Sequence, residues 1–269
     1  MASFQHKIII VTGSSQGIGK FLALALAQRG AQIILNGRNP EKLEKVRAWM
    51  APQVEKAPVA IPADVSNWED CERLVQTTIE QFGRIDTLVC NAGINMVGPI
   101  AQSDPHSMRK VMDVNFLGNL FPVRAAVEAI TQTKGSILLV GSIAGFHGLP
   151  MTGIYSSSKM ALTALAQSLQ IELHDAGVHV GLAYVGMTEV EEGKTVMDTS
   201  GKAIKKPKFT IKPEPIDNAV RRMVRMLETR RKKQVFTTIG KINAFMNRLA
   251  PGLVSRILVG NFRKMQKEQ

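Results

Sequence analysis

Residues 7–19, Lys7-Ile-Ile-Ile-Val-Thr-Gly-Ser-Ser-Gln-Gly-Ile-Gly19, decide the fold of this chain. A short run of β-branched apolar residues leads into a glycine-rich turn, and apolar residues at helical spacing follow at once. Glycines permit positive φ and close backbone approach, so the first amides of the helix can face an anion such as a pyrophosphate. The context is that of a dinucleotide-binding turn, although a purely structural strand-to-helix turn is the alternative.

Short apolar runs alternate along the chain with segments that carry apolar residues three to four apart. The apolar runs are 7–12, 32–36, 59–61, 87–91, 136–142, 178–185 and 234–238. The segments with helical spacing include 19–29, 40–49, 67–82, 108–131 and 154–176. Such alternation indicates βαβ units joined by right-handed crossovers. We therefore expect an α/β Rossmann fold with a doubly wound parallel seven-stranded sheet, whose ligand lies beyond the carboxyl ends of the strands.

Two regions depart from this alternation. The first, about 187–212, is rich in Glu, Lys and Pro without clear periodicity, and we expect a mobile lid there. The second, 240–269, carries apolar residues at helical spacing around Pro251-Gly252 and predicts two short amphipathic helices. The expected division is a dinucleotide-binding and catalytic domain over 1–239 and a basic C-terminal helical extension over 240–269.

Composition and charge narrow the functional classes. The two cysteines, Cys71 and Cys90, form no CxxC pair, and the five histidines offer no metal pair, so neither a disulfide framework nor a metal site is expected. No cleaved signal and no membrane-spanning segment are expected, and a reducing, cytoplasmic compartment fits best. The net charge of +12 lies almost wholly after Val220, where 13 Lys and Arg face 2 acidic residues.

The second expected strand ends Leu35-Asn36-Gly37-Arg38, with no carboxylate placed to accept hydrogen bonds from the adenosine ribose hydroxyls. The Arg38 guanidinium can instead pair with a 2′-phosphate through charge-assisted hydrogen bonds. We therefore expect NADP(H) to be preferred over NAD(H). An ordinary solvated arginine is the alternative interpretation.

The sequence resembles the short-chain dehydrogenase/reductase family over its first 190 residues. Four motifs in the same order and spacing carry the resemblance. They are the loop from Thr12 to Gly19, Asn91-Ala-Gly93, Asn115 within Val114-Asn-Phe116, and Ser142 followed by Tyr155-Ser-Ser-Ser-Lys159.

Tyr155 and Lys159 are four residues apart on the helix expected from 154, so their side chains can meet on one face. A free phenol has a pKa of about 10, but an adjacent ammonium and an oxidised nicotinamide both favour the phenolate. Tyr155 can therefore act as general acid or base. Ser142 follows a buried strand, where its hydroxyl can bind and orient the substrate oxygen. The resemblance implies that Asn115 holds a water in a proton relay and that Lys159 also bonds the nicotinamide ribose.

The resemblance also implies a set of cofactor contacts. They are Gly13, Ser15, Gln16, Gly17, Ile18 and Gly19 in the first loop, Asp64 and Val65 at the adenine, Asn91, Ala92 and Gly93 along the ribose, and Tyr155 with Lys159. For Asp64, a helix N-cap is the alternative role. Thr188 completes the set, although the proline of the family pattern is lost in Tyr184-Val-Gly-Met-Thr188 and the threonine comes early.

These residues predict an NADP(H)-dependent oxidoreductase that interconverts an alcohol and a ketone or aldehyde. A lipophilic substrate is favoured by apolar residues near the expected cleft, which could equally be core. These residues are Ile94, Met96, Val97, Ile143, Phe146, Leu149, Met151 and Met187. A reductase of carrier-protein-bound 3-oxoacyl thioesters is one alternative. A non-catalytic NADP(H)-binding sensor or scaffold is another, and the intact catalytic set argues against it.

The remaining expectations concern partners. Apolar residues on more than one face of 108–131 and 154–176 predict a homodimer or homotetramer. The basic C-terminal segment predicts contact with an anionic membrane, against the alternatives that it closes over the cleft, packs on a subunit or is a solvated basic face. Nucleic acid is not expected, because the basic run lacks interleaved aromatic residues.

Overall fold

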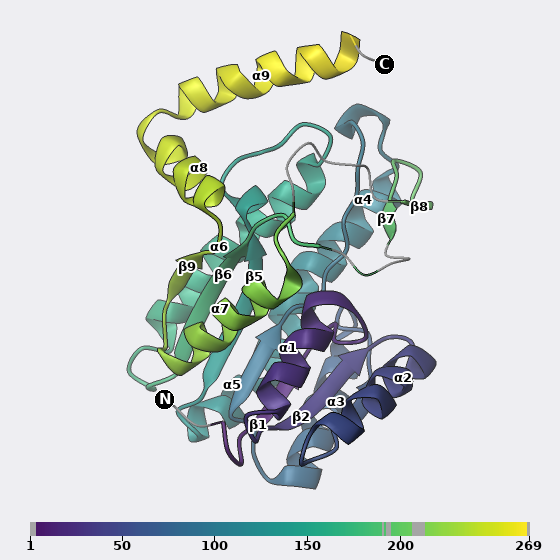
Figure 1. The fold of residues 1–269 in the computed structure, drawn as a ribbon, viewed down its shortest axis with the longest axis vertical. Helices are drawn as coiled ribbons and strands as arrows, with labels where there is room; N and C mark the ends of the chain where they lie inside the picture. The colour runs from purple at the N-terminus through teal and green to yellow at the C-terminus, as the bar shows by residue number, and fades with distance from the viewer. Residues whose placement is uncertain (1–3, 190, 192–194, 206–212, 268–269) are drawn as a thin grey trace.

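The computed structural model describes residues 4–189, 191, 195–205 and 213–267, and its main sheet has seven strands, all paired in parallel, in the order β3-β2-β1-β4-β5-β6-β9 (Figure 1). The strands are β1 (Ile8–Val11), β2 (Gln32–Gly37), β3 (Val59–Pro62), β4 (Thr87–Cys90), β5 (Ser136–Ser142), β6 (His179–Val185) and β9 (Lys233–Val235). The strand order reverses direction between β1 and β4, which is the switch point where ligands bind in such sheets. The expected doubly wound parallel sheet is confirmed.

Helices cover both faces of this sheet (Figure 1). They are α1 (Gly17–Ala27), α2 (Pro40–Met50), α3 (Trp68–Phe82), α4 (Pro105–Met112), α5 (Gly118–Gln132), α6 (Gly153–Glu172), α7 (Ile216–Glu228), α8 (Thr238–Leu249) and α9 (Pro251–Lys267). Apolar residues of α1, α2 and α7 join one core cluster, and those of α3, α5 and α6 join the other. The sheet therefore separates two cores.

Strand β1 explains why so short a segment organises the fold. Side chains alternate along a strand, so Ile9 and Val11 enter the core under α1 while Ile8 and Ile10 enter the core on the opposite face. All four are at most 7% exposed. Burial of each such side chain stabilises the fold by about 1.5–3 kcal/mol. The continuous apolar run is thus the signature of a strand covered on both faces.

The helical segment expected over 108–131 is confirmed, but it is not one regular α-helix. The chain instead forms α4, a π-helical turn over Asp113–Leu117 (η3), and α5. Pro122 lies inside α5 and has no N–H to donate one turn back, which weakens the helix just after this turn. Such π-helical turns are frequent at functional sites.

The region expected as a lid contains structure that its composition does not suggest. Strands β7 (Thr195–Met197) and β8 (Ala203–Lys205) form an antiparallel hairpin. The hairpin is tied to the chain after β4, because the Met197 amide donates to the Asn95 carbonyl at 2.9 Å and the Val97 amide donates to the Met197 carbonyl at 2.8 Å. Residues 190, 192–194 and 206–212 of the expected lid lie outside the described part of the chain.

The C-terminal residues form α8 and α9, which lie together at one end of the molecule (Figure 1). Thr237 caps α8 by accepting a hydrogen bond from the Gly240 amide at 3.1 Å, and Pro251 occupies the first position of α9, where a missing N–H costs nothing. Among the described residues, none of the helices is both long and apolar enough to cross a bilayer.

Candidate active site

A cleft opens at the carboxyl ends of β1, β2, β4, β5 and β6, where the fold is expected to bind its ligand. Of the residues expected in the site, those that line the cleft are Gly13, Ser15, Gln16, Gly17, Ile18, Arg38, Asp64, Val65, Asn91, Ala92, Gly93, Ser142, Tyr155, Lys159 and Thr188. Gly19 and Asn115 are not among the residues that line the cleft. The fold thus gathers residues from position 13 to position 188 at one edge of the sheet.

The glycine loop has the geometry that an approaching phosphate requires. Gly13 adopts φ +62°, and a Cβ there would lie 2.7 Å from the Ala92 Cα, so a larger residue would both strain and collide. A Cβ at Gly19 would lie 2.6 Å from the Gly13 carbonyl oxygen. The loop delivers the chain directly into α1, whose first amides and positive dipole end face the cleft. These features fit a dinucleotide pyrophosphate.

Asn91 has a role that its motif alone does not reveal. Its Nδ2 donates to the carbonyl oxygens of Thr12 and Gly13 at 3.0 and 3.1 Å, and its backbone amide donates to the Thr12 hydroxyl at 3.0 Å. These bonds tie the loop after β4 to the loop after β1. Asn91 therefore braces the phosphate loop, and its contact with a ribose stays a prediction.

Arg38 and Asp64 face each other in the cleft, just after β2 and β3. The Arg38 Nη1 lies 3.6 Å from the Asp64 carboxylate, and the two side chains are 55% and 34% exposed. Asp64 also accepts hydrogen bonds from the Ser66 amide and hydroxyl at 3.0 and 2.6 Å. The helix cap considered for Asp64 is instead supplied by Asn67, whose Oδ1 accepts from the Asp70 amide at the start of α3.

Three side chains with acid–base or hydrogen-bonding capacity meet at the end of β5. Ser142 is the last residue of that strand, while Tyr155 and Lys159 stand one turn apart on α6. The Lys159 Nζ is 5.9 Å from the centre of the Tyr155 ring and donates to the Val140 carbonyl at 3.0 Å. Lys159 is 5% exposed, so its charge acts on Tyr155 with little screening by water.

The Tyr155 phenol is perturbed by its surroundings. Burial raises the pKa of Tyr155 above its ordinary value, and a hydrogen bond with Ser142 lowers it in opposition. The phenol is therefore protonated at neutral pH and already paired with the hydroxyl beside which a substrate oxygen would lie. Such a group is prepared to donate a proton.

Asn115 is fully buried in the π-helical turn η3. Its side-chain oxygen accepts from the Ile94 amide at 2.8 Å, and its Nδ2 donates to the Ile94 carbonyl at 2.9 Å and to the Ser158 hydroxyl at 3.0 Å. Ser158 in turn donates to the Tyr155 carbonyl at 2.7 Å. Asn115 thus joins the loop after β4 to the helix that carries Tyr155, and its water-mediated role stays a prediction.

Two expectations at the rim of the cleft have mixed outcomes. Thr188 is buried and lines the cleft, but its hydroxyl donates to the Gly186 carbonyl at 3.2 Å.

Of the apolar residues expected around a substrate, Ile94 lines the cleft, whereas the Phe146 ring stacks on Tyr184 at 4.2 Å between centroids and packs against the core. Placement of Phe146 in the cleft is therefore wrong. Val196 and Met197 of the hairpin line the cleft without having been expected there.

Glu191 is a further residue that the motifs did not identify. Its carboxylate accepts a hydrogen bond from the amide of Gly17, the first residue of α1, and pairs with the Lys20 ammonium at 2.7 Å. An acidic side chain therefore lies at the helix N-terminus that the glycine loop prepares for an anion. No local pattern relates Glu191 to Gly17, because 174 positions separate them.

The strand order, the glycine loop and the polar cluster on β5 and α6 define a dinucleotide-binding protein of the Rossmann class. Residues 7–200 match the family described as short chain dehydrogenase. The chain belongs to this family.

Individual relatives agree with this assignment. The 11-beta-hydroxysteroid dehydrogenase-like 4A of Arabidopsis thaliana is 38% identical over 197 residues, which make up 71% of this chain but only 64% of the plant protein. An alcohol dehydrogenase from the archaeon Thermococcus sibiricus, solved with 5-hydroxy-NADP, is 26% identical, with a TM-score of 0.75 over 86% of this chain and 96% of that one. A short chain dehydrogenase/reductase from Burkholderia phymatum with NAD, 20% identical, has a TM-score of 0.81 over 94% of this chain and 96% of that one, a likeness of fold.

Proposed function

We propose that this protein is an NADP(H)-dependent oxidoreductase that interconverts an alcohol and a ketone or aldehyde. The observation that carries the proposal is the convergence of Ser142, Tyr155 and Lys159 beside the phosphate loop in one cleft. A nicotinamide cofactor, when bound there, supplies or accepts the hydride. The protein's own residues have only to bind the oxygen and move its proton.

The mechanism follows from the arrangement of these three side chains. In reduction, Tyr155 donates its phenolic proton to the developing alkoxide, and Ser142 holds the same oxygen by a hydrogen bond. The Lys159 ammonium stabilises the phenolate that remains. In oxidation the phenolate accepts the hydroxyl proton. We assign Asn115 the water that returns protons to Lys159, since Asn115 donates a hydrogen bond to Ser158, the residue of α6 next to Lys159.

The cofactor preference rests on Arg38. Its half-exposed guanidinium stands at the end of β2, where an adenosine 2′-phosphate would lie, and it is close enough to Asp64 to be oriented by that carboxylate. The Thermococcus relative was solved in complex with 5-hydroxy-NADP, and this is consistent with the proposal. The cofactor contacts from Gly13 to Thr188, including the ribose contact of Lys159, belong to the same proposal.

The substrate we propose is lipophilic. Ile94, Val196 and Met197 contribute apolar side chains to the lining of the cleft, and these would bind a hydrocarbon skeleton. The name of the Arabidopsis relative, a hydroxysteroid dehydrogenase-like protein, is consistent with such a substrate.

The test of the proposed activity follows NADPH oxidation by absorbance with lipophilic ketones, small polar ketones and carrier-bound 3-oxoacyl thioesters. Turnover of the thioesters alone would favour the carrier-protein reductase, and NADPH binding without any turnover would favour a sensor.

Assembly and location complete the proposal. Met160 and Ile171 on α6 are 42% and 78% exposed, which supports a homodimer or homotetramer formed through this helix. Cys71 and Cys90 are free and buried, in agreement with a cytoplasmic location. We further propose that the cytoplasmic protein meets a membrane surface through its C-terminal segment.

The rate of ketone reduction is expected to fall at alkaline pH, because reduction needs the protonated phenol of Tyr155. Burial raises the pKa of Tyr155, so the fall belongs above neutral pH. The nearby Lys159 ammonium favours the phenolate, and Lys159→Met should therefore move the fall to higher pH by about one unit. The measurement is kcat/KM for the ketone against pH in both proteins. A shift to lower pH would mean that the titrating group is not Tyr155.

Glu191→Gln is expected to strengthen NADPH binding by about fivefold, because the Glu191 carboxylate occupies the helix N-terminus that a pyrophosphate would use and repels its negative charge. In the wild type, the carboxylate of Glu191 holds the Gly17 amide and Lys20 that a pyrophosphate would engage. Titration by fluorescence measures the Kd, and Glu172→Gln, the control, removes the same charge from an exposed residue of α6 that does not line the cleft. Weaker binding in Glu191→Gln alone would show that Glu191 assists the bound cofactor instead of competing with it.

A further inference from the structure

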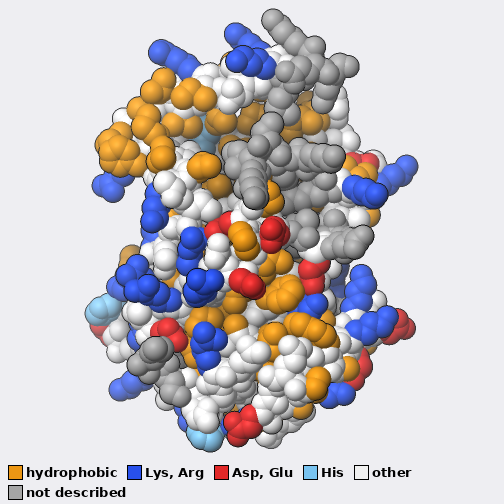
Figure 2. All heavy atoms as spheres, viewed as in Figure 1, with side chains coloured by type: hydrophobic (Ala, Val, Ile, Leu, Met, Phe, Trp, Pro, Cys, Tyr) orange, Lys and Arg blue, Asp and Glu red, His pale blue; other side chains and the backbone are white. Residues whose placement is uncertain are grey.

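Helices α8 and α9 expose an unusual amount of apolar surface. The side chains concerned are between 47% and 64% exposed, and they are Ile239, Ile242, Phe245, Leu249, Leu253, Ile257 and Val259. Within each helix most of them are three or four residues apart, which places them on one side of α8 and one side of α9. These residues are called the apolar stripe of α8 and α9. Figure 2 shows apolar side chains gathered over this end of the molecule, with Lys and Arg side chains around them.

The comparison with α7 makes the exposure significant. That helix is also amphipathic, but its apolar residues Met223, Val224 and Leu227 are 0%, 3% and 6% exposed because they pack on the sheet. The apolar stripe of α8 and α9 faces away from any core among the described residues. A contiguous apolar surface of this kind marks a binding surface.

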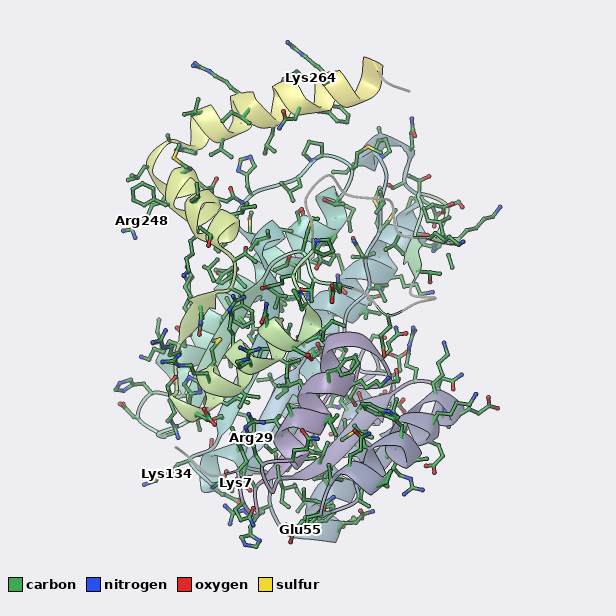
Figure 3. The ribbon with its side chains drawn as sticks, in the orientation of Figure 1. Lys7, Arg29, Glu55, Lys134, Arg248 and Lys264 are labelled. Atoms are coloured by element: carbon green, nitrogen blue, oxygen red, sulfur yellow. The ribbon has the colours of Figure 1, made fainter. Side chains whose placement is uncertain are left out.

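The charges on these helices identify the occupant. Between 238 and 267 the sequence has no acidic residue and six basic ones, Lys241, Arg248, Arg256, Arg263, Lys264 and Lys267. Figure 3 shows Arg248 and Lys264 extending outward from the two helices. A second copy of the chain would bring the same positive charges face to face. An anionic lipid surface would pair with them while it accepts the apolar stripe.

The helices are fastened to the catalytic end of the molecule. The Asn247 Nδ2 donates to the Phe146 carbonyl at 2.5 Å, and its Oδ1 lies 2.9 Å from the His147 Nδ1. A Cβ at Gly240 would lie 2.7 Å from Ile143, so α8 packs tightly on the turn Ile143–Gly145. That turn begins at the residue after Ser142. The position of α8 is therefore fixed relative to the group that orients the substrate.

We propose that α8 and α9 dock this protein on an anionic membrane, with the apolar stripe in the acyl boundary and the basic residues at the headgroups. Docking through α8 brings the cleft near the surface, so a carbonyl compound dissolved in the membrane enters it without crossing bulk water. This delivery step rests on the proposed function, whereas the docking itself does not.

The docking is tested by sedimentation of the full-length protein with vesicles of phosphatidylcholine alone and of phosphatidylcholine with phosphatidylserine. We expect binding to the anionic vesicles. The double variant Lys241→Glu with Arg248→Glu should weaken this binding tenfold or more, because it replaces two charges that anionic headgroups attract by two that they repel. The control, Lys42→Glu with Arg29→Glu, makes the same net change on exposed residues of α2 and the end of α1 and should bind as the wild type does. Phe245→Ser should also weaken binding, whereas Trp49→Ser, which removes an exposed aromatic side chain from α2, should not.

Absence of anionic vesicle binding by the wild type would overturn the docking proposal, as would loss of self-association instead of vesicle binding in Phe245→Ser. Vesicle binding needs neither cofactor nor substrate, so a failure of the proposed catalytic function would leave this measurement intact. The delivery step has its own test. The double variant should turn over a water-soluble ketone at the wild-type rate and a vesicle-partitioned ketone more slowly, and equal rates on both would overturn delivery.

Discussion

Tyr155→Phe is expected to lower kcat for ketone reduction by about a thousandfold while NADPH binding is retained, because a positioned acid or base contributes roughly 10²–10⁴ in rate. The substitution removes only the phenolic oxygen. The ring can keep its place on α6, and Lys159 can keep its hydrogen bond to the Val140 carbonyl. The oxygen of the substrate would then lack a proton donor beside Ser142.

The chain offers a matched control in its only other tyrosine, Tyr184. Tyr184 is 1% exposed on β6, and its hydroxyl lies 2.9 Å from the Thr163 hydroxyl. Tyr184→Phe should lower the free energy of unfolding by about 1 kcal/mol, the usual net value of one hydrogen bond, with little change in kcat. Single-turnover kinetics and NADPH titration separate the two effects. A Tyr155→Phe protein that keeps a tenth of the wild-type rate would mean that another group moves the proton.

The strands of the main sheet were open to prediction because strands buried on both faces are apolar at consecutive positions. Ile8 to Val11 must be apolar at every position, since neighbouring side chains enter different cores. The glycines of the first loop leave a record of the same kind, since a Cβ at Gly13 would collide with Ala92. Apolar residues and glycines that sterics require in this way can be recognised in a single sequence.

Features that depend on distant contacts were not open to prediction. The π-helical turn coincides with the hydrogen bonds of Asn115 to Ile94 and Ser158, and the local spacing of apolar residues resembles one continuous helix. The hairpin of β7 and β8 pairs with Asn95 and Val97, far away in sequence. Helix α7 differs, because Val220, Met223, Val224 and Leu227 are spaced helically and would have revealed it beside the basic residues.

The residues of the candidate site also fall into those that could be predicted from the sequence and those that depend on distant contacts. The resemblance identified the residues that face the cleft, and the structure brings them together there. It did identify Asn91, but it could not reveal the hydrogen bonds by which Asn91 holds Thr12 and Gly13. Nor could it reveal Glu191, whose carboxylate lies at the phosphate loop only because the chain after β6 folds back over α1.

Arg38→Ala is expected to weaken NADPH binding about 10- to 100-fold, the range of one charged group's hydrogen bonds to a phosphate, and to leave NADH binding unchanged. NADH lacks the 2′-phosphate, so it gives Arg38 no phosphate to hold. Because the Arg38 side chain is 55% exposed, salt should screen the interaction, and the loss should be largest at low ionic strength. The measurement is the Kd of both cofactors at two salt concentrations.

Arg73→Ala is the matched control for this change. The Arg73 side chain is also 55% exposed and pairs with an aspartate, Asp70, at 2.7 Å, but it does not line the cleft. A general loss of positive charge would weaken NADPH binding equally in both variants, whereas a specific phosphate contact requires the loss in Arg38→Ala alone. If Arg38→Ala binds NADPH as the wild type does, Arg38 is an ordinary solvated residue held by Asp64. Any selectivity for NADP(H) would then have to come from another residue. The proposed catalytic role of Tyr155 would not be affected by that result.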